Sequence, residues 1–114
     1  MKIPIILIFL SLALASVLAS FTVYAADQSI CHSGATVLLY DNGSLKSCQL
    51  EQDYEANGIQ CKRNNDISFY NNGNLESCVL SKPATLDMNI CKGDGLVSFY
   101  IDGKLKSCVK PDNL

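Results

Sequence analysis

Residues 31–48 read CHSGATVLLYDNGSLKSC, and the same pattern returns in residues 61–78 as CKRNNDISFYNNGNLESC and in residues 91–108 as CKGDGLVSFYIDGKLKSC. Each copy begins thirty residues after the one before it, with no insertion. The two Cys, one Tyr, one Gly, one Leu and one Ser are identical in all three copies. A repeat of this kind predicts an array of three similar structural modules.

Each copy is predicted to form a β-hairpin. A short run of β-branched or aromatic residues ends at the shared Tyr and is followed by Asn-Gly or Asp-Gly. These dipeptides adopt the two positive φ angles of a type I′ turn at the least cost, so we expect type I′ turns here. In the first module such a turn places Tyr40 opposite Leu45. It also places Leu38 opposite Ser47.

The predicted register divides each hairpin into two faces. One face carries Tyr, Leu and Ser, and the other carries Cys with apolar residues, so we expect the Cys face to form the core. In the segment SKPATLDMNI between two hairpins, the alternation of Leu86, Met88 and Ile90 indicates one further strand. No segment after Ala25 has a helical period. The fold class is therefore predicted to be all-β.

The N-terminal segment is typical of an export signal. No charged residue occurs between Lys2 and Asp27, and Val23-Tyr24-Ala25 offers a signal peptidase its small side chains, so we expect a signal helix cleaved after Ala25. The alternative is an uncleaved anchor, because the apolar run is long enough to span a bilayer. Either alternative places the domain outside the cell membrane, in the periplasm or secreted. The predicted division is a signal peptide over 1–25 and a β domain over 26–114, with modules 29–58, 59–88 and 89–114.

Six Cys in an exported chain of this size indicate disulfides, and six Cys allow fifteen pairings. Pairing between modules leaves Cys31 and Cys108 unpaired, whereas pairing within modules uses every Cys, so we favour the second pattern. Each bridge then closes a short loop and contributes about 3 kcal/mol. The predicted pairs are Cys31 with Cys48, Cys61 with Cys78, and Cys91 with Cys108.

No catalytic, metal or cofactor site is predicted. His32 is the only histidine, and its place beside Cys31 is typical of a solvated loop residue. No two Cys lie close enough in sequence for a Cys-x-x-Cys redox motif or a zinc knuckle. Nucleophile and phosphate-loop motifs are absent from the sequence. The net charge of −2 is too small to indicate a nucleic-acid partner.

The three shared tyrosines are the candidate contact surface. Tyr40, Tyr70 and Tyr100 fall at equivalent positions, so in a regular array they form a row on one face. Such a row can pack on the shared Leu residues, or it can present amphipathic rings to a protein, peptide or glycan.

The strings LYDNGSL, FYNNGNL and FYIDGKL resemble the MORN-repeat variant family of β-hairpin arrays. The resemblance covers about seven residues per module, and it implies a hairpin array that makes protein contacts rather than one that catalyses a reaction. The flanking Cys, the thirty-residue period and the signal depart from that family's usual pattern. We therefore expect an exported structural or protein/glycan-binding module, with no nucleic acid and with membrane contact only through an uncleaved N-terminal segment. The alternatives are a small secreted effector or inhibitor, and a thiol-redox or metal-binding protein.

Overall fold

A computed structural model describes residues 26–112 of the chain. The predicted signal segment lies outside these residues. A short 3-10 helix, η1 (Gln28–Ile30), is followed by ten strands. The strands are β1 (Leu38–Leu39), β2 (Leu45–Gln49), β3 (Tyr54–Ala56), β4 (Ile59–Cys61), β5 (Asp66–Phe69), β6 (Leu75–Val79), β7 (Ala84–Leu86), β8 (Asn89–Cys91), β9 (Leu96–Phe99) and β10 (Leu105–Cys108).

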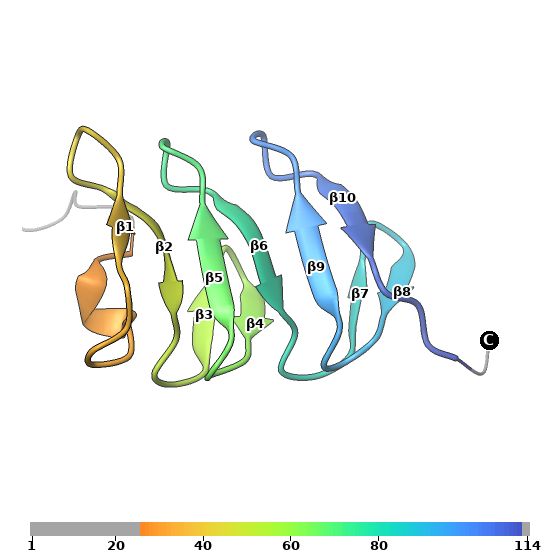
Figure 1. The fold of residues 1–114 in the computed structure, drawn as a ribbon. Helices are drawn as coiled ribbons and strands as arrows, with labels where there is room; N and C mark the ends of the chain where they lie inside the picture. Colours follow the sequence, from red (N-terminus) through yellow and green to blue (C-terminus); the bar gives the residue numbers. More distant parts are fainter. Residues whose placement is uncertain (1–25, 113–114) are drawn as a thin grey trace, which may run out of the picture.

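The main layer is a six-stranded antiparallel sheet in the order β1-β2-β5-β6-β9-β10. Figure 1 shows its three hairpins side by side, with their tight turns at the same end of the sheet. The fold is thus all-β, as predicted, and it is built from hairpins at the thirty-residue spacing. Within residues 26–112, no helix is long and apolar enough to cross a membrane.

Between the main hairpins the chain forms smaller linking hairpins, β3–β4 and β7–β8, which lie behind the sheet in Figure 1. The prediction of a single further strand in this segment is wrong. Asp87 and Met88 both have positive φ, at 47° and 67°, and so form a two-residue turn where the alternation suggests a continuous strand. Asn57 and Gly58 form the equivalent turn in the first linking hairpin. Positive φ at both central residues is the property of a type I′ turn.

The turns of the main sheet have a different geometry from the one predicted. Gly43 has a φ of 87°, whereas the preceding Asn42 is not in the positive-φ region, so the type I′ prediction is wrong for this turn. The Gly43 N–H donates to the Tyr40 carbonyl at 2.9 Å, and the Tyr40 N–H donates to the Ser44 carbonyl at 2.9 Å. One glycine in the left-handed region suffices for a turn followed by a bulge. Gly73 and Gly103 repeat this arrangement.

The bulge shifts the register by one residue near the turn. Leu38 lies opposite Ser47, as predicted, but Leu45 lies opposite Leu39 instead of Tyr40. The equivalent pairs in the other modules are Phe69 with Leu75 and Phe99 with Leu105. Placing the shared Tyr opposite the shared Leu is therefore wrong, because a single extra residue in one strand exchanges the faces beyond it.

The core lies between the sheet and the linking hairpins. The Cys face of the sheet is buried, as predicted, but the register shift turns Leu45 and Leu75 into this core as well, which corrects their placement on the opposite face. Leu50 and Leu80, which follow β2 and β6, are fully buried. The remaining buried apolar residues are Cys31, Cys48, Ala56, Ile59, Cys61, Ile67, Phe69, Cys78, Cys91, Val97 and Phe99.

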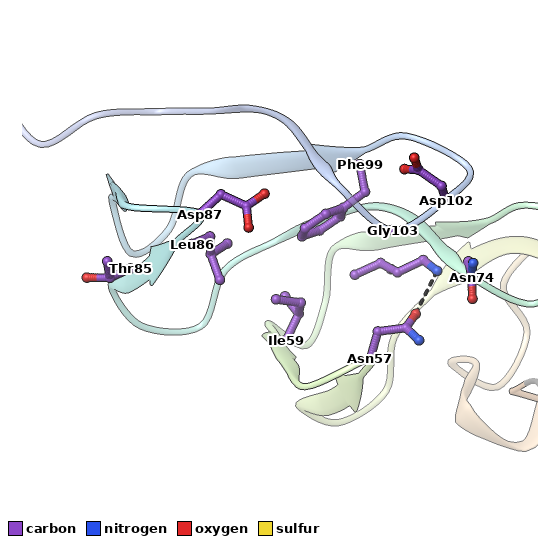
Figure 2. Close-up of a pocket in the computed structure, with 10 residues that line it drawn as sticks. Asn57, Ile59, Asn74, Thr85, Leu86, Asp87, Phe99, Asp102 and Gly103 are labelled. Atoms are coloured by element: carbon purple, nitrogen blue, oxygen red, sulfur yellow. Dashed lines mark hydrogen bonds between the residues drawn. The ribbon is translucent and has the colours of Figure 1, made fainter.

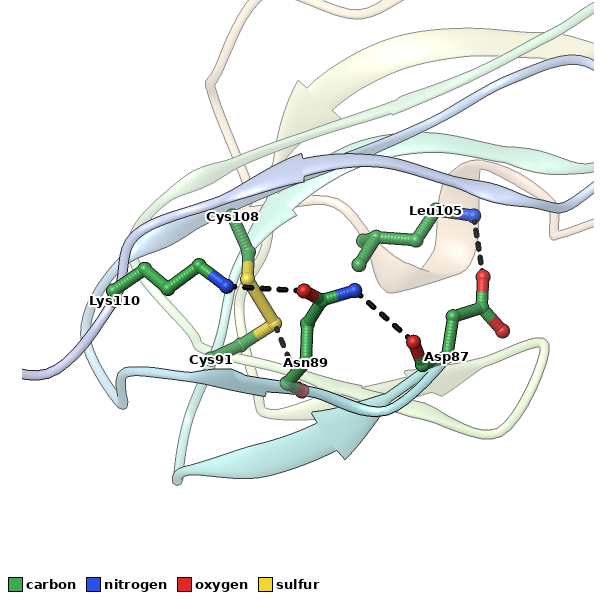
Figure 3. Close-up of a disulfide and its surroundings, with 6 residues drawn as sticks. All are labelled: Asp87, Asn89, Cys91, Leu105, Cys108 and Lys110. Carbon is green, nitrogen blue, oxygen red and sulfur yellow. Dashed lines mark hydrogen bonds between the residues drawn. A yellow bond between two sulfur atoms is a disulfide. The ribbon is translucent and has the colours of Figure 1, made fainter. Parts of the chain in front are cut away.

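The disulfides pair within modules, as predicted: Cys31 with Cys48, Cys61 with Cys78, and Cys91 with Cys108. In the second and third modules, each bridge joins a linking hairpin to the main sheet. Figure 3 shows the bridge between Cys91 of β8 and Cys108 of β10. The covalent links therefore hold the two layers together in addition to the small apolar core.

Candidate binding cleft between the linking hairpins

The outer face of the main sheet carries a row of serines. Cross-strand pairing joins them in sequence across five neighbouring strands, and Leu38 occupies the equivalent place in β1. In β2, β5, β6 and β9, at least one neighbour of the serine, such as Cys48 or Ile67, is buried on the opposite face. The row consists of Ser47, Ser68, Ser77, Ser98 and Ser107.

The three candidate tyrosines have unequal environments. The Tyr40 hydroxyl donates to the Phe69 carbonyl at 2.7 Å, and the Tyr70 hydroxyl donates to the Phe99 carbonyl at 2.8 Å. Each of these bonds joins one module to the next. Tyr100 belongs to the last module, is 52 % exposed, and donates to no acceptor among residues 26–112. A role of the three rings in contacting a ligand remains a prediction. The hydroxyls of Tyr40 and Tyr70 already form hydrogen bonds between modules.

A cleft of about 350 Å³ opens between the two linking hairpins, on the side of the main-sheet turns. Figure 2 shows Ile59 of β4, Leu86 of β7 and Phe99 of β9 around the same space. A second depression, of about 230 Å³, also includes Ile59 and Leu86 and extends past Leu80. The two depressions share Ile59 and Leu86 and are therefore neighbours, and together they are called the groove. Its larger part has the volume of a small-molecule or side-chain site.

The rim of the larger cleft is polar and acidic. Asp87 lies at the tip of the second linking hairpin, and Asp102 lies in the third main-sheet turn. Asn57 and Asn74 also line the cleft. Among the described residues that line this cleft there is no Lys or Arg. The rim therefore favours a neutral or basic ligand over an acidic one.

Both walls of the cleft are fixed to the sheet at their tips. The Asn57 side-chain oxygen accepts a hydrogen bond from the Leu75 N–H at 2.8 Å, drawn in Figure 2. The Asp87 carboxylate accepts the equivalent bond from the Leu105 N–H at 3.0 Å, drawn in Figure 3. Since each wall is also held by a disulfide, the cleft is formed before any ligand arrives.

One strand edge borders this groove without a partner. Among the described residues, β7 pairs with β8 only, and all three β7 residues line one or both depressions. In a two-residue hairpin the pair next to the turn is hydrogen-bonded, so the following pair, Thr85 and Ile90, directs its main-chain groups away from the partner strand. Thr85 therefore presents an N–H and a C=O at the open edge.

Three ion pairs lie on the surface of the described residues, away from the cleft. Lys62 of the second module contacts Asp94 of the third at 2.6 Å, and this hydrogen bond holds the pKa of the Asp94 carboxyl below its ordinary value. His32 is exposed, and its Nδ1 lies 3.3 Å from the Ser33 carbonyl oxygen, with no carboxylate partner among residues 26–112. Across the same residues, no three His, Cys, Asp or Glu side chains gather as metal ligands.

Comparison of the chain with known protein families, with curated proteins and with solved structures found no match. The resemblance to MORN-repeat variants therefore remains a hypothesis based on the motif. The three intramolecular disulfides are consistent with an oxidising, exported environment.

The cleft was not predicted from the sequence. Its lining comes from segments more than forty residues apart, such as Asn57 and Gly103. The available signal was the Asn57-Gly58 dipeptide, which marks the first linking hairpin as strongly as the main-sheet turns are marked.

Proposed function

We propose that the protein is an exported, non-enzymatic binding module that takes an extended, neutral or basic segment of a protein ligand into the groove between its linking hairpins. The observation that carries this proposal is the open edge of β7 along a preformed groove. An extended peptide that adds to a free strand edge gains main-chain hydrogen bonds, and pockets beside the edge select its side chains.

The groove also provides pockets beside the strand edge that can select the side chains of a ligand. Ile59, Leu75 and Phe99 give it an apolar floor, so one apolar ligand side chain can be buried there. Asp87 and Asp102 on the rim favour a Lys or Arg beside that side chain. The expected ligand motif is therefore an apolar residue next to a basic one, within an extended segment.

Selection from a random peptide library on the oxidised, exported protein tests this proposal, followed by calorimetry with the selected peptides. Thr85→Pro removes the outward N–H at a position where an edge strand tolerates proline. We expect this change to weaken peptide binding at least about tenfold. Glu55→Pro is the matched control, because Glu55 is the equivalent residue of β3 and lines neither depression.

An array of neutral oligosaccharides is probed in parallel. Peptides that share the apolar-basic motif and lose affinity in Thr85→Pro alone would support the proposal. Selected peptides that bind both variants equally would contradict it. Binding to oligosaccharides with no peptide selected would also contradict it, and would assign the cleft to glycans.

A further inference from the structure

The junctions between modules share a fixed set of contacts. Strand β2 pairs with β5 at the first junction, and β6 pairs with β9 at the second. The Leu50 N–H donates to the Asn65 carbonyl at 3.0 Å, and the Asn64 N–H donates to the Leu50 carbonyl at 2.8 Å. Leu80 makes the same two bonds with Gly95 and Asp94. Together with the hydrogen bonds from Tyr hydroxyls to carbonyl oxygens, these contacts make up the interface between one module and the next.

The N-terminal edge of the array already has the form that a preceding module binds. Gly34 has a φ of 82°, and Asn64 and Asp94, its equivalents at the two internal junctions, are also in the left-handed region at 63°. The Ala35 N–H donates to the His32 carbonyl at 3.1 Å, as the Gly95 N–H does to Lys92. At the internal junctions the equivalent loop binds the preceding module. In the first module this loop already has the same conformation, although no module precedes it within residues 26–112.

The same edge exposes apolar side chains that internal modules bury or replace. Leu39 is 44 % exposed, whereas its equivalents Phe69 and Phe99 are buried. Leu38 is 48 % exposed and stands where Ser68 and Ser98 stand in the other modules. An exposed apolar strand edge of this kind is a surface for pairing with another strand.

The C-terminal edge is the complement of the N-terminal one. Residues 105–108 of β10 read LKSC, identical to residues 45–48 of β2, which bind β5 through this edge. Tyr100 is half-exposed, and its hydroxyl occupies the position from which Tyr40 and Tyr70 donate to the next module. Leu39, at the other end of the array, is equivalent to Phe69 and Phe99, whose carbonyl oxygens accept the bonds from Tyr40 and Tyr70. The Leu39 carbonyl is therefore the equivalent acceptor for Tyr100.

We propose that the protein associates head to tail with further copies of itself, with β10 of one copy pairing with β1 of the next in the register of the internal junctions. In this register Ser107 of one copy lies opposite Leu38 of the next, as Ser47 lies opposite Ser68. The two surfaces are different, so the contact is heterologous. Because it repeats the internal junctions, which extend the sheet in one direction, it produces an open chain of copies.

One residue weakens this junction relative to the internal ones. Lys110 stands where Leu50 and Leu80 are fully buried, and in the single chain its amine donates to the Asn89 side-chain oxygen at 3.0 Å (Figure 3). Burial of Leu50 and Leu80 stabilises the internal junctions, whereas a lysine must leave its partner and its water. The association between copies is therefore weaker than the contact between modules, and reversible.

Site-specific crosslinking tests the register directly. Copies carrying Leu38→Cys are mixed with copies carrying Ser107→Cys under mild oxidation, using the exported, oxidised protein. We expect a covalent dimer containing one copy of each. Leu38→Cys mixed with Ser77→Cys is the matched control, because Ser77 belongs to the same row inside the sheet. Equal crosslinking to Ser77→Cys, or none to Ser107→Cys, would overturn the proposal.

Sedimentation velocity over a concentration series provides an independent measurement. Lys110→Leu is expected to tighten self-association roughly tenfold, with a mass that increases beyond the dimer. Tyr100→Phe is expected to weaken it roughly fivefold. Lys46→Leu, the same change on the internal strand β2, should have no effect. A mass that remains monomeric in Lys110→Leu, or that stops at a dimer, would contradict a head-to-tail chain.

Discussion

The Tyr70 hydroxyl donates a hydrogen bond to the main-chain carbonyl oxygen of Phe99 at 2.8 Å, and thereby joins the second module to the third. Tyr40 makes the same bond to Phe69, so the shared tyrosine acts across the junction and not only within its own hairpin. This relationship explains why the residue recurs at thirty-residue intervals. It also separates Tyr100, which has no such acceptor among the described residues, from the other two.

Tyr70→Phe should therefore lower the free energy of unfolding, whereas Tyr100→Phe should not. Loss of the internal hydrogen bond costs about 1 kcal/mol, because the Phe99 carbonyl is left without its donor. In Tyr100→Phe the lost hydroxyl is only solvated in the single chain. Urea unfolding of dilute, oxidised protein measures both changes. Equal destabilisation by the two substitutions would contradict the assignment of this energy to the hydrogen bond at the junction.

Met88→Gly should stabilise the protein by roughly 0.5 to 1 kcal/mol. Met88 has a φ of 67°, a conformation that is unfavourable for a residue with a Cβ atom. Its side chain is almost fully exposed, so no packing compensates for this cost. Gly58 holds the equivalent position in the first linking hairpin, and Gly58→Met should destabilise by a similar amount. Thermal unfolding of both variants tests this pair. A stabilising Gly58→Met would contradict the turn assignment.

Removing one disulfide should cost about 3 kcal/mol, because each bridge closes a loop with a sequence separation of 17. The double change of Cys61 and Cys78 to Ala is expected to loosen the first linking hairpin from the sheet and to reduce peptide binding in the groove as well. Unfolding of the double variant gives the energy. Mass mapping of the unreduced native protein checks the pairing, and a peptide linking Cys48 to Cys61 would refute it.

The ion pair between Lys62 and Asp94 should make stability depend on pH in a defined direction. The pKa of Asp94 is lowered in the folded protein, so the pair's contribution is present above the carboxyl's ordinary range and is lost as the pH falls through the lowered value. Asp94→Asn should therefore be less stable than the natural protein at neutral pH, with the difference vanishing once the pH is below the lowered pKa of Asp94. A difference that persists in acid would exclude the ion pair as its cause.

Much of the fold could be predicted because the repeat constrains it. The thirty-residue period, the main hairpins and the pairing of Cys31 with Cys48 and of its equivalents all follow from treating the three copies alike. The linking hairpins could not be predicted in full, since Met88 occupies a turn position at which propensity disfavours it. Local sequence does not reveal a turn that tertiary packing imposes.

The register near the main turns and the cleft could also not be predicted from the sequence. The dipeptide Asn42-Gly43 is compatible with a type I′ turn and with a bulged turn, and the choice decides whether Leu39 or Tyr40 faces Leu45. The cleft arises only when two linking hairpins are placed side by side behind the sheet. Neither hairpin carries it alone.

Amide hydrogen exchange at Thr85, with and without a peptide selected on the protein, tests the central claim most directly. If an extended ligand adds to the open edge of β7, the Thr85 amide becomes hydrogen-bonded and its exchange slows by at least about tenfold. The amide of Glu55 in β3 should be unchanged. Unchanged exchange at Thr85 under saturating peptide, with protection elsewhere, would contradict binding along this strand.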